Sequence, residues 1–378
     1  MAAAGLMEIY LQMAYDAVAV GPYDLAAGVE FLKNGRFKNF PWVSANLMDK
    51  NHNLLFPAAK IIERGALKIG ILGLTGQIAG TSPETIVADW RKVLPEHLER
   101  LTEECRLVIV LSSLSGEDNA ELTRQFPQVH VLIAADRQQG NIVPRFEYST
   151  LVTQTMSQGK YLGVLNLDWI AGSSWGKDQE QEPGAASGKE PSHLRSNFTG
   201  NFIPLSKSLP DDRQIAMRIE EIKQQIYTHN QRSTASGEQK NATASPAFSG
   251  LSGSDRCQEC HPLQTSFWKS TRHAGAYATL QRQQQNFNLD CLPCHITTSA
   301  AEQAGTSSME SLLTLPAALQ SVGCEACHGP GLTHADSPDK VKPQGKVKEK
   351  TCTACHTKER DPAFNYLEKI LKVSCPAG

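Results

Sequence analysis

The sequence predicts a layered α/β domain followed by a smaller domain that is mainly α-helical and rich in loops. Short apolar runs alternate with helical stretches over residues 15–170, which is typical of an α/β fold. Nine of the ten cysteines lie between Cys257 and Cys375, so the last third has a different chemistry. Residues 172–192 and 232–254 are rich in Gly, Ser, Gln, Glu and Thr, and we interpret them as an insertion and a linker.

The composition excludes several classes of protein. With 378 residues, of which 40% are hydrophobic and 20% charged, the chain can bury one or two ordinary cores and is not disordered throughout. Lys and Arg number 37 against 39 for Asp and Glu, so the basic excess that nucleic-acid binding requires is missing. No run approaches eighteen apolar residues, so we expect no transmembrane segment.

Five apolar runs supply the expected strands of the first domain. They are Ala17–Val20, Trp42–Ala45, Lys68–Gly73, Leu107–Leu111 and Val129–Ile133. A further short strand is expected at residues 201–205, followed by a helix that closes the domain. The apolar face of this helix consists of Ile215, Ile219, Ile222 and Ile226. We therefore expect domains at residues 1–230 and 255–378, joined by a linker at residues 231–254.

The last third contains four copies of one motif, Cys-x-x-Cys-His. They are Cys257-Gln-Glu-Cys260-His261, Cys291-Leu-Pro-Cys294-His295, Cys324-Glu-Ala-Cys327-His328 and Cys352-Thr-Ala-Cys355-His356, which we number motifs 1 to 4. This is the attachment pattern of c-type haem. Two thiols three residues apart can form thioethers to one edge of a porphyrin, and the next histidine can bind its iron. The motifs predict four covalent haems c, with eight cysteines as attachment residues and four histidines as iron ligands.

These cysteines have two alternative uses. Two Cys-x-x-Cys pairs can together make a four-thiolate zinc site, and thiols can also pair as disulfides. Neither use requires a histidine directly after every pair, four times out of four. Haem attachment explains that histidine, so it is the interpretation that we favour.

Four haems would share about 120 residues with few apolar side chains. The larger ones include Phe267, Trp268, Leu280, Leu312 and Leu319. We therefore expect the haems to form most of this core, and haem loss to unfold the domain.

Covalent haem attachment takes place on the oxidising side of the bacterial inner membrane, so we expect a periplasmic or extracellular protein. Residues 1–21 have no basic segment of an export signal and carry Glu8 and Asp16. We expect the true start of the protein to lie upstream.

A sixth ligand decides whether a haem only passes electrons or also binds a small molecule. In the last third, His273 and His334 are the histidines outside the four motifs. Each is either an exposed residue or an iron ligand, and their position beside four irons favours ligation. At least one iron is then left without a local second histidine.

Residues 255–378 resemble the tetrahaem cytochrome c family typified by the electron acceptor of hydroxylamine oxidoreductase. The resemblance rests on the four motifs and on three further segments. These segments are Ser266-Phe-Trp-Lys-Ser-Thr-Arg-His273-Ala, Gly323-Cys-Glu-Ala-Cys-His-Gly-Pro-Gly331 followed by His334, and Phe364-Asn-Tyr366.

This resemblance implies a scheme of axial ligands. His273 would bind the haem of His356, and His334 would bind the haem of His261. The haem of His295 would be five-coordinate and open. The family gives the haem of His328 a later histidine, but none follows His356 here. Candidate substitutes are Cys375, which is otherwise a free terminal thiol, and His229 or His193 from the first domain.

The first domain resembles the metallophosphoesterase domain of periplasmic 5'-nucleotidases and UDP-sugar hydrolases. The matching segments are Tyr15–Gly21, Val43–Leu47, Ile69–Thr75 and Gly159–Gly163. The resemblance implies an incomplete form of that fold, because the family's first strands would lie before Met1.

The metal-binding motifs of that family are degraded. The segments Gly21-Pro-Tyr-Asp24, Ser112-Ser-Leu-Ser115 and Ala134-Ala-Asp136-Arg-Gln138 stand where the family has its metal ligands. Asp24 and Asp136 could hold a cation, but a helix cap and a solvated loop are the ordinary roles of such residues. Without the imidazoles they make no dinuclear hydrolytic site, so we expect no phosphoesterase activity.

Together these observations predict an exported multihaem cytochrome that transfers single electrons, joined to an inactive phosphoesterase-like domain for docking or scaffolding. Its partners would be other cytochromes or quinol-linked oxidoreductases. A basic run could dock an acidic partner or simply be solvated: Lys340, Lys342, Lys346, Lys348 and Lys350. The alternatives are a reductase or oxidase of a small nitrogen or oxygen compound at the His295 haem, and a haem-linked phosphohydrolase.

Overall fold

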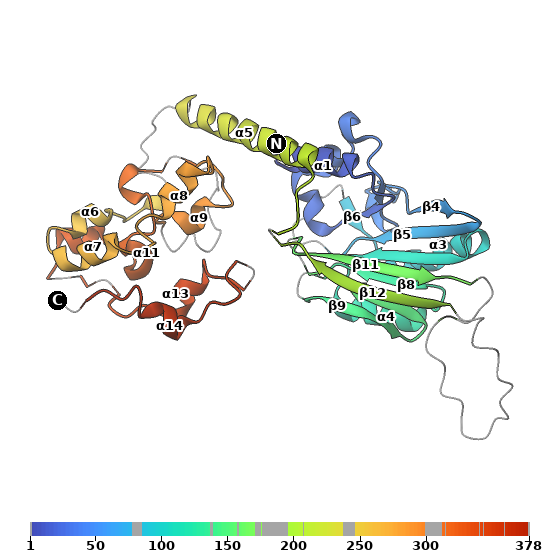
Figure 1. Ribbon diagram of the computed structural model, residues 1–378. Helices are drawn as coiled ribbons and strands as arrows, with labels where there is room; N and C mark the ends of the chain where they lie inside the picture. The colour runs from blue at the N-terminus through green and yellow to red at the C-terminus, as the bar shows by residue number, and fades with distance from the viewer. Residues whose placement is uncertain are drawn as a thin grey trace, which may run out of the picture. The chain divides into compact units, whose positions relative to one another are not determined.

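The chain forms two compact units in a computed structural model, residues 3–215 and residues 216–378 (Figure 1). The structure describes residues 2–77, 85–136, 139–156, 159–170, 175, 196–206, 208–236, 246–298, 312–313, 315–339, 341–342, 344–358 and 360–376. Most of the expected insertion at residues 172–192 lies outside these ranges. Within them, no helix is both long enough and apolar enough to cross a membrane.

The first unit is built on a six-stranded sheet with the order β4-β5-β7-β8-β10-β9. The four central strands are parallel, and the edge strands β4 and β9 run antiparallel to their neighbours. The strands are β4 Ala59–Arg64, β5 Leu67–Leu74, β7 Leu107–Ser112, β8 Val131–Ala134, β9 Ile142–Glu147 and β10 Thr150–Gln154. Three of the expected strands are confirmed here, as β5, β7 and β8.

Both faces of this sheet are covered, because its apolar side chains alternate between them. Leu72 and Leu74 of β5 pack in one core with α3 (Trp90–Glu104) and α4 (Gly116–Gln125). Ile69 and Ile71, on the opposite face, pack in a second core with the hairpin of β11 (Tyr161–Asp168) and β12 (Asn197–Pro204). The layered α/β character that the sequence predicts is thus confirmed.

The first part of the unit adds small elements around a third cluster. Parallel β1 and β2 and antiparallel β3 and β6 form two short sheets. The bounds are α1 Ala2–Gln12, β1 Val18–Ala19, η1 Pro22–Ala27, α2 Val29–Leu32, η2 Gly35–Phe37, β2 Trp42–Val43, β3 Leu47–Asp49 and β6 Thr85–Val87. The expected strands at Ala17–Val20 and Trp42–Ala45 correspond to β1 and β2. Their apolar residues pack with Phe37, Phe40 and Phe56.

Helix α5 (Arg213–Ser236) is the predicted isoleucine helix, and it crosses the division between the units. Residues 216–230, which we expected to close the first domain, lie in the second unit. Tyr227 packs edge to face with Phe287, and Asn230 Nδ2 donates a hydrogen bond of 2.7 Å to Phe287 O. The second half of α5 is therefore tied to the segment before motif 2.

The second unit consists of short helices joined by loops. The helices are η5 Pro246–Phe248, α6 Ser254–Cys257, α7 Pro262–Lys269, α8 Ala276–Arg282, α9 Leu292–His295, η7 Ala317–Leu319, α11 Cys324–His328, α12 Leu332–Asp336, α13 Glu349–Thr353 and α14 Tyr366–Ile370. A small apolar cluster lies around motif 2 and includes Phe248, Tyr277, Leu280, Leu292 and Leu319. Elsewhere few apolar side chains of this unit are buried in the described ranges.

Candidate haem sites

Each motif lies on or beside a short helical segment that brings its two cysteines onto one turn. Motifs 2 and 3 form α9 and α11. In motifs 1 and 4 the histidine N–H donates to the carbonyl of the first cysteine, at 2.9 Å in both cases. This local turn sets two thiols and an imidazole on one side of the backbone, as attachment to a single porphyrin requires.

The thiols are free, and they meet between motifs rather than within them. The thiols of Cys257 and Cys324 lie close enough to interact, which raises the pKa of Cys257 and lowers the pKa of Cys324. Likewise the interaction between the thiols of Cys294 and Cys355 lowers the pKa of Cys294 and raises the pKa of Cys355. Motif 1 therefore adjoins motif 3, and motif 2 adjoins motif 4.

Motifs 3 and 4 are also neighbours. Burial raises the pKa of Cys327 to about 11, and the nearby thiols of Cys352 and Cys375 add to this rise. Cys327 in turn contributes to the raised pKa of Cys355. The four attachment sites thus adjoin one another in the order 1, 3, 4, 2.

Two pairs of histidine rings lie at a separation that matches two imidazoles bound to one metal ion. The ring centres of His261 and His334 are 6.3 Å apart with an interplanar angle of 28°, and those of His273 and His356 are 6.3 Å apart at 54°. A metal–imidazole bond of about 2.0 Å on each side, plus about 1.1 Å from nitrogen to ring centre, gives a separation of about 6.2 Å. The residues present therefore fit an iron held between each pair.

Hydrogen bonds orient four of the six candidate ligands through Nδ1. The acceptors are Ala276 O for His295 (2.8 Å), Gln344 O for His328 (2.6 Å), Val341 O for His334 (2.6 Å) and Asp361 Oδ2 for His356 (2.8 Å). Because carbonyls and carboxylates only accept, Nδ1 is the donor at each of these histidines, and Nε2 is the nitrogen available to bind a metal ion. This arrangement is typical of histidine that binds a metal.

His295 and His328 differ from the paired histidines. Within the described ranges neither ring lies against a second histidine ring. Cys375 lies close enough to Cys327 to raise the pKa of Cys327, and Cys324 in turn raises the pKa of Cys375. Gln264 Nε2 donates a hydrogen bond of 3.2 Å to Pro376 O and so holds this tail. His229 is an exposed residue of α5, and His193 lies outside the described residues.

A zinc site would require several ligand side chains to converge. Among the residues that the structure describes, no group of three or more His, Cys, Asp or Glu is arranged to hold a metal ion.

The side chains of the degraded metal segments form hydrogen bonds that stabilise local structure in the first unit. Asp24 Oδ2 accepts from Gly21 N at 2.7 Å, within η1, and burial raises the pKa of Asp24. Asp136 lies in the loop after β8, half-buried, and its Oδ2 accepts from Gly116 N at 3.0 Å, at the start of α4. Ser112 Oγ donates to Asn119 Oδ1 at 2.6 Å, and Ser115 caps α4. Arg137 and Gln138 lie outside the described residues.

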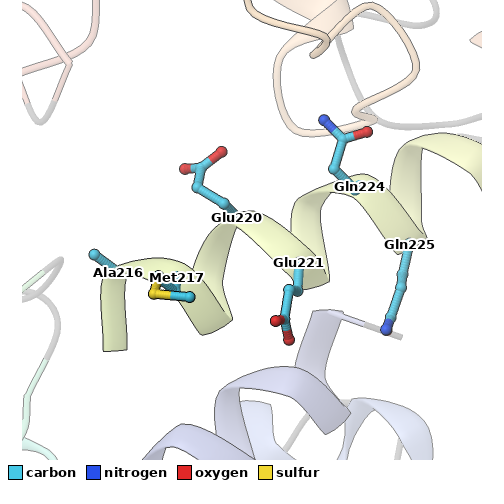
Figure 2. A pocket seen from close by; sticks show the side chains of 6 residues that line it. All are labelled: Ala216, Met217, Glu220, Glu221, Gln224 and Gln225. Carbon is cyan, nitrogen blue, oxygen red and sulfur yellow. The ribbon is translucent and has the colours of Figure 1, made fainter. Parts of the chain in front are cut away.

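A surface hollow in the second unit carries no site. It is lined by Ala216, Met217, Glu220, Glu221, Gln224 and Gln225 of α5. Figure 2 shows Glu220 and Gln224 on one side of the helix and Glu221 and Gln225 on the other, so their polar groups do not converge.

Sequence analysis missed two acidic residues that the structure places at the haem sites. Asp361 orients His356, and Glu325 is buried inside motif 3. The sequence offered no signal for either residue, since motif 1 also carries a glutamate between its cysteines, Glu259, and that residue is exposed.

Comparisons with known proteins agree with the two halves of the chain. The family model "Cytochrome c554 and c-prime" matches residues 256–329, which include motifs 1 to 3. Cytochrome c-554 of Nitrosomonas europaea is 30% identical over 137 residues, covering 28% of this chain and 56% of that protein. Snake venom 5'-nucleotidase of Naja atra is 25% identical over 253 residues, covering 57% of this chain and 43% of that protein.

The chain thus spans about half the length of these relatives. Among solved structures, the 5'-nucleotidase precursor from Thermus thermophilus is 19% identical with a TM-score of 0.46, covering 59% of this chain and 46% of that one. The two sequence relatives confirm the resemblances that the motifs predicted: the last third resembles the tetrahaem cytochromes c, and the first part resembles the 5'-nucleotidases.

Proposed function

We propose that the last third of this protein carries four covalent haems c and transfers electrons one at a time between redox partners. The observation that carries the proposal is the set of four Cys-x-x-Cys-His motifs whose thiols adjoin one another. Bound haem supplies an iron that changes between two oxidation states. The chain supplies thioether attachment, axial imidazoles and the spacing between sites.

The order of the sites defines a route. Motif 1 adjoins motif 3 through Cys257 and Cys324, and motif 4 adjoins motif 2 through Cys355 and Cys294. With motifs 3 and 4 also adjoining, the route runs from the His261 site to the His295 site. His334 and His273 are the proposed sixth ligands of the His261 and His356 sites, which makes both six-coordinate.

The His295 site supports a second candidate function. It lies at one end of the route, and its ring has no facing histidine in the described ranges, while Nδ1 is held by Ala276 O. An open iron there would bind a small nitrogen or oxygen compound and make the protein a reductase or oxidase. Turnover of such a compound with a reduced donor would favour this function.

The first unit is proposed to act as a docking or scaffolding domain without hydrolytic activity. Asp24, Ser112 and Asp136 form hydrogen bonds within their own unit, which supports this proposal. A haem-linked phosphohydrolase would require these residues to bind catalytic metal ions.

Location and partners follow from the proposed chemistry. Covalent haem attachment implies an exported protein in the periplasm or outside the cell. Other cytochromes or quinol-linked oxidoreductases are the proposed partners. The exposed lysines that the structure describes would suit an acidic partner surface: Lys342, Lys346, Lys348 and Lys350.

One experiment tests the main proposal. The full chain is produced in a bacterium with haem-attachment machinery, its mass is measured, and a redox titration is followed by absorption and electron paramagnetic resonance spectra. We expect four haems per chain, with at least two low-spin sites and one high-spin site. A bare or zinc-loaded polypeptide would contradict the proposal.

A further inference from the structure

Glu325 is a buried carboxylate between the two attachment cysteines of motif 3. Its side chain belongs to a residue that is 5% exposed. It accepts five hydrogen bonds: from Ser252 N at 2.9 and 3.1 Å, Ser252 Oγ at 3.3 Å, Gly253 N at 2.8 Å and Gly331 N at 2.7 Å. Hydrogen bonds to a charged acceptor are stronger than neutral ones, so this side chain holds its partners firmly.

These partners belong to segments that carry the ligands of another site. Ser252 and Gly253 lead directly into α6, which ends at Cys257 of motif 1. Gly331 is the residue before α12, which carries His334. One carboxylate in motif 3 therefore joins the start of motif 1 to the helix that faces His261.

Helix α12 depends on such anchoring, because its five residues include no buried side chain. Two other hydrogen bonds hold this region: Leu332 N donates to Gly250 O at 3.0 Å, and His334 Nδ1 donates to Val341 O at 2.6 Å. The first of these reaches the same loop that Glu325 binds. Among the groups that hold α12 in place, the carboxylate of Glu325 is the buried one.

We propose that Glu325 is a positioning residue that holds His334 opposite His261 and so maintains two axial histidines at the motif 1 haem. The inference rests on the proposed function, since it assumes a haem at motif 1. It assigns to motif 3 a second role, the control of coordination at the adjoining site.

Glu325→Gln tests the proposal, because the amide keeps the shape of the side chain but turns one acceptor oxygen into a donor facing backbone N–H groups. In protein with four haems by mass, we expect the low-spin ferric signal of one haem to fall by at least half. Carbon monoxide binding by the reduced protein should rise by up to one molecule per chain.

The same haem should change in His334→Ala, and adding Glu325→Gln to that variant should change the spectrum little further, because both act on one ligand. Glu349→Gln is the matched control, since Glu349 is exposed in the first turn of α13 just before motif 4. It should retain the spectrum of the unmodified protein.

If Glu325→Gln is not recovered with its haems, a second variant alters the partner residue Gly331, whose N–H donates to Glu325. A Cβ atom at Gly331 would lie 3.1 Å from Glu325 Oε1, so Gly331→Ala must displace the carboxylate or α12. Unchanged spin states and carbon monoxide stoichiometry in either variant, with four haems attached, would overturn the proposal. Absence of four haems from the unmodified protein would instead contradict the proposed function.

Discussion

Asp361 Oδ2 lies 2.8 Å from Nδ1 of His356, and in the part of the chain that the structure describes this is the one motif histidine whose Nδ1 faces a carboxylate. The Nδ1 atoms of His295, His328 and His334 face backbone carbonyls instead. A carboxylate makes the imidazole a stronger electron donor than a carbonyl does, and a stronger donor favours the oxidised iron. The His356 site is therefore expected to have a lower reduction potential than the His295 and His328 sites.

Asp361→Asn should raise the reduction potential of one haem by on the order of tens of millivolts, because a neutral amide accepts a weaker hydrogen bond from His356 Nδ1. A redox titration of the haem-loaded protein measures this shift. Glu368→Gln removes a nearby exposed charge that has no contact with a motif histidine among the described residues, and it should leave the potentials almost unchanged. Equal shifts in both variants would show a general charge effect instead.

His273→Ala should convert the His356 haem from six-coordinate low-spin to an open site, because the ring 6.3 Å away is its proposed second ligand. We expect one low-spin signal to disappear and one more carbon monoxide to bind per chain. His52→Asn serves as control: His52 is exposed in the first unit at φ 63°, a conformation that asparagine tolerates. An unaltered spectrum in His273→Ala would exclude His273 as a ligand.

Thiol counting distinguishes haem attachment from zinc binding. Eight of the ten cysteines lie in the motifs, so a fully loaded chain should contain two free thiols, Cys105 and Cys375. Cys375 is exposed and Cys105 is buried at 4% exposure. Alkylation at pH 8 should therefore label one thiol in the native protein and two after denaturation. Labelling of eight or more thiols after denaturation would mean that the thioethers are absent, and a native Cys375 that resists labelling would indicate iron ligation.

The first unit should hydrolyse neither nucleotides nor phosphate esters when manganese or zinc is added. Its candidate metal residues are engaged locally, as shown by Asp136 with Gly116 N and Ser112 with Asn119. Phosphate release from a nucleoside monophosphate, measured with the full haem-loaded chain, checks this expectation. Metal-dependent release that disappears in Asp136→Ala would restore the haem-linked phosphohydrolase.

Acid should destabilise the first unit through His130. This side chain is buried, its Nδ1 accepts from Val108 N at 3.0 Å, and burial lowers the pKa of His130. The folded state resists protonation, whereas the unfolded chain takes up a proton below about pH 6.5, so stability falls as the pH drops below that value.

The urea midpoint at pH 7.5 and at pH 5.5 measures this loss. Pulse labelling of Cys105, the one cysteine of the first unit, reports unfolding of that unit alone. His130→Gln retains an acceptor but does not titrate, so its midpoint should fall less on acidification. The same fall in both proteins would show that other groups dominate the response to acid.

Strand prediction succeeded for the parallel strands β5, β7 and β8 and missed the interior strand β10 and both edge strands, β4 and β9. Lys68–Gly73 and Leu107–Leu111 lie within β5 and β7 because continuous apolar runs are typical of central parallel strands. The edge strand β4 was missed, since Ala59–Arg64 carries charged residues and exposes most of its side chains. Its pairing with β5 supplies the stabilisation that its composition does not indicate.

The haem attachment sites could be predicted from the sequence, because the two cysteines and the histidine of each site lie within one five-residue motif. The degraded metal motifs of the first unit, in contrast, were recognised only through the resemblance to the 5'-nucleotidase family. The pairing of His261 with His334 and of His273 with His356 was suggested by family resemblance alone, since no local pattern joins residues so far apart in the chain.

Folding brings together residues whose proximity cannot be inferred from their spacing in the sequence. Motifs 1 and 3 are neighbours because the folded chain brings Cys257 close to Cys324. Helix α12 is held in place because backbone N–H groups from two segments donate hydrogen bonds to Glu325. Such contacts join atoms from distant segments, and backbone donors are the same for every residue type. Chemistry carried by one short segment was therefore predictable, whereas the order of the haem sites and the anchoring of their second ligands arose only from the packed chain.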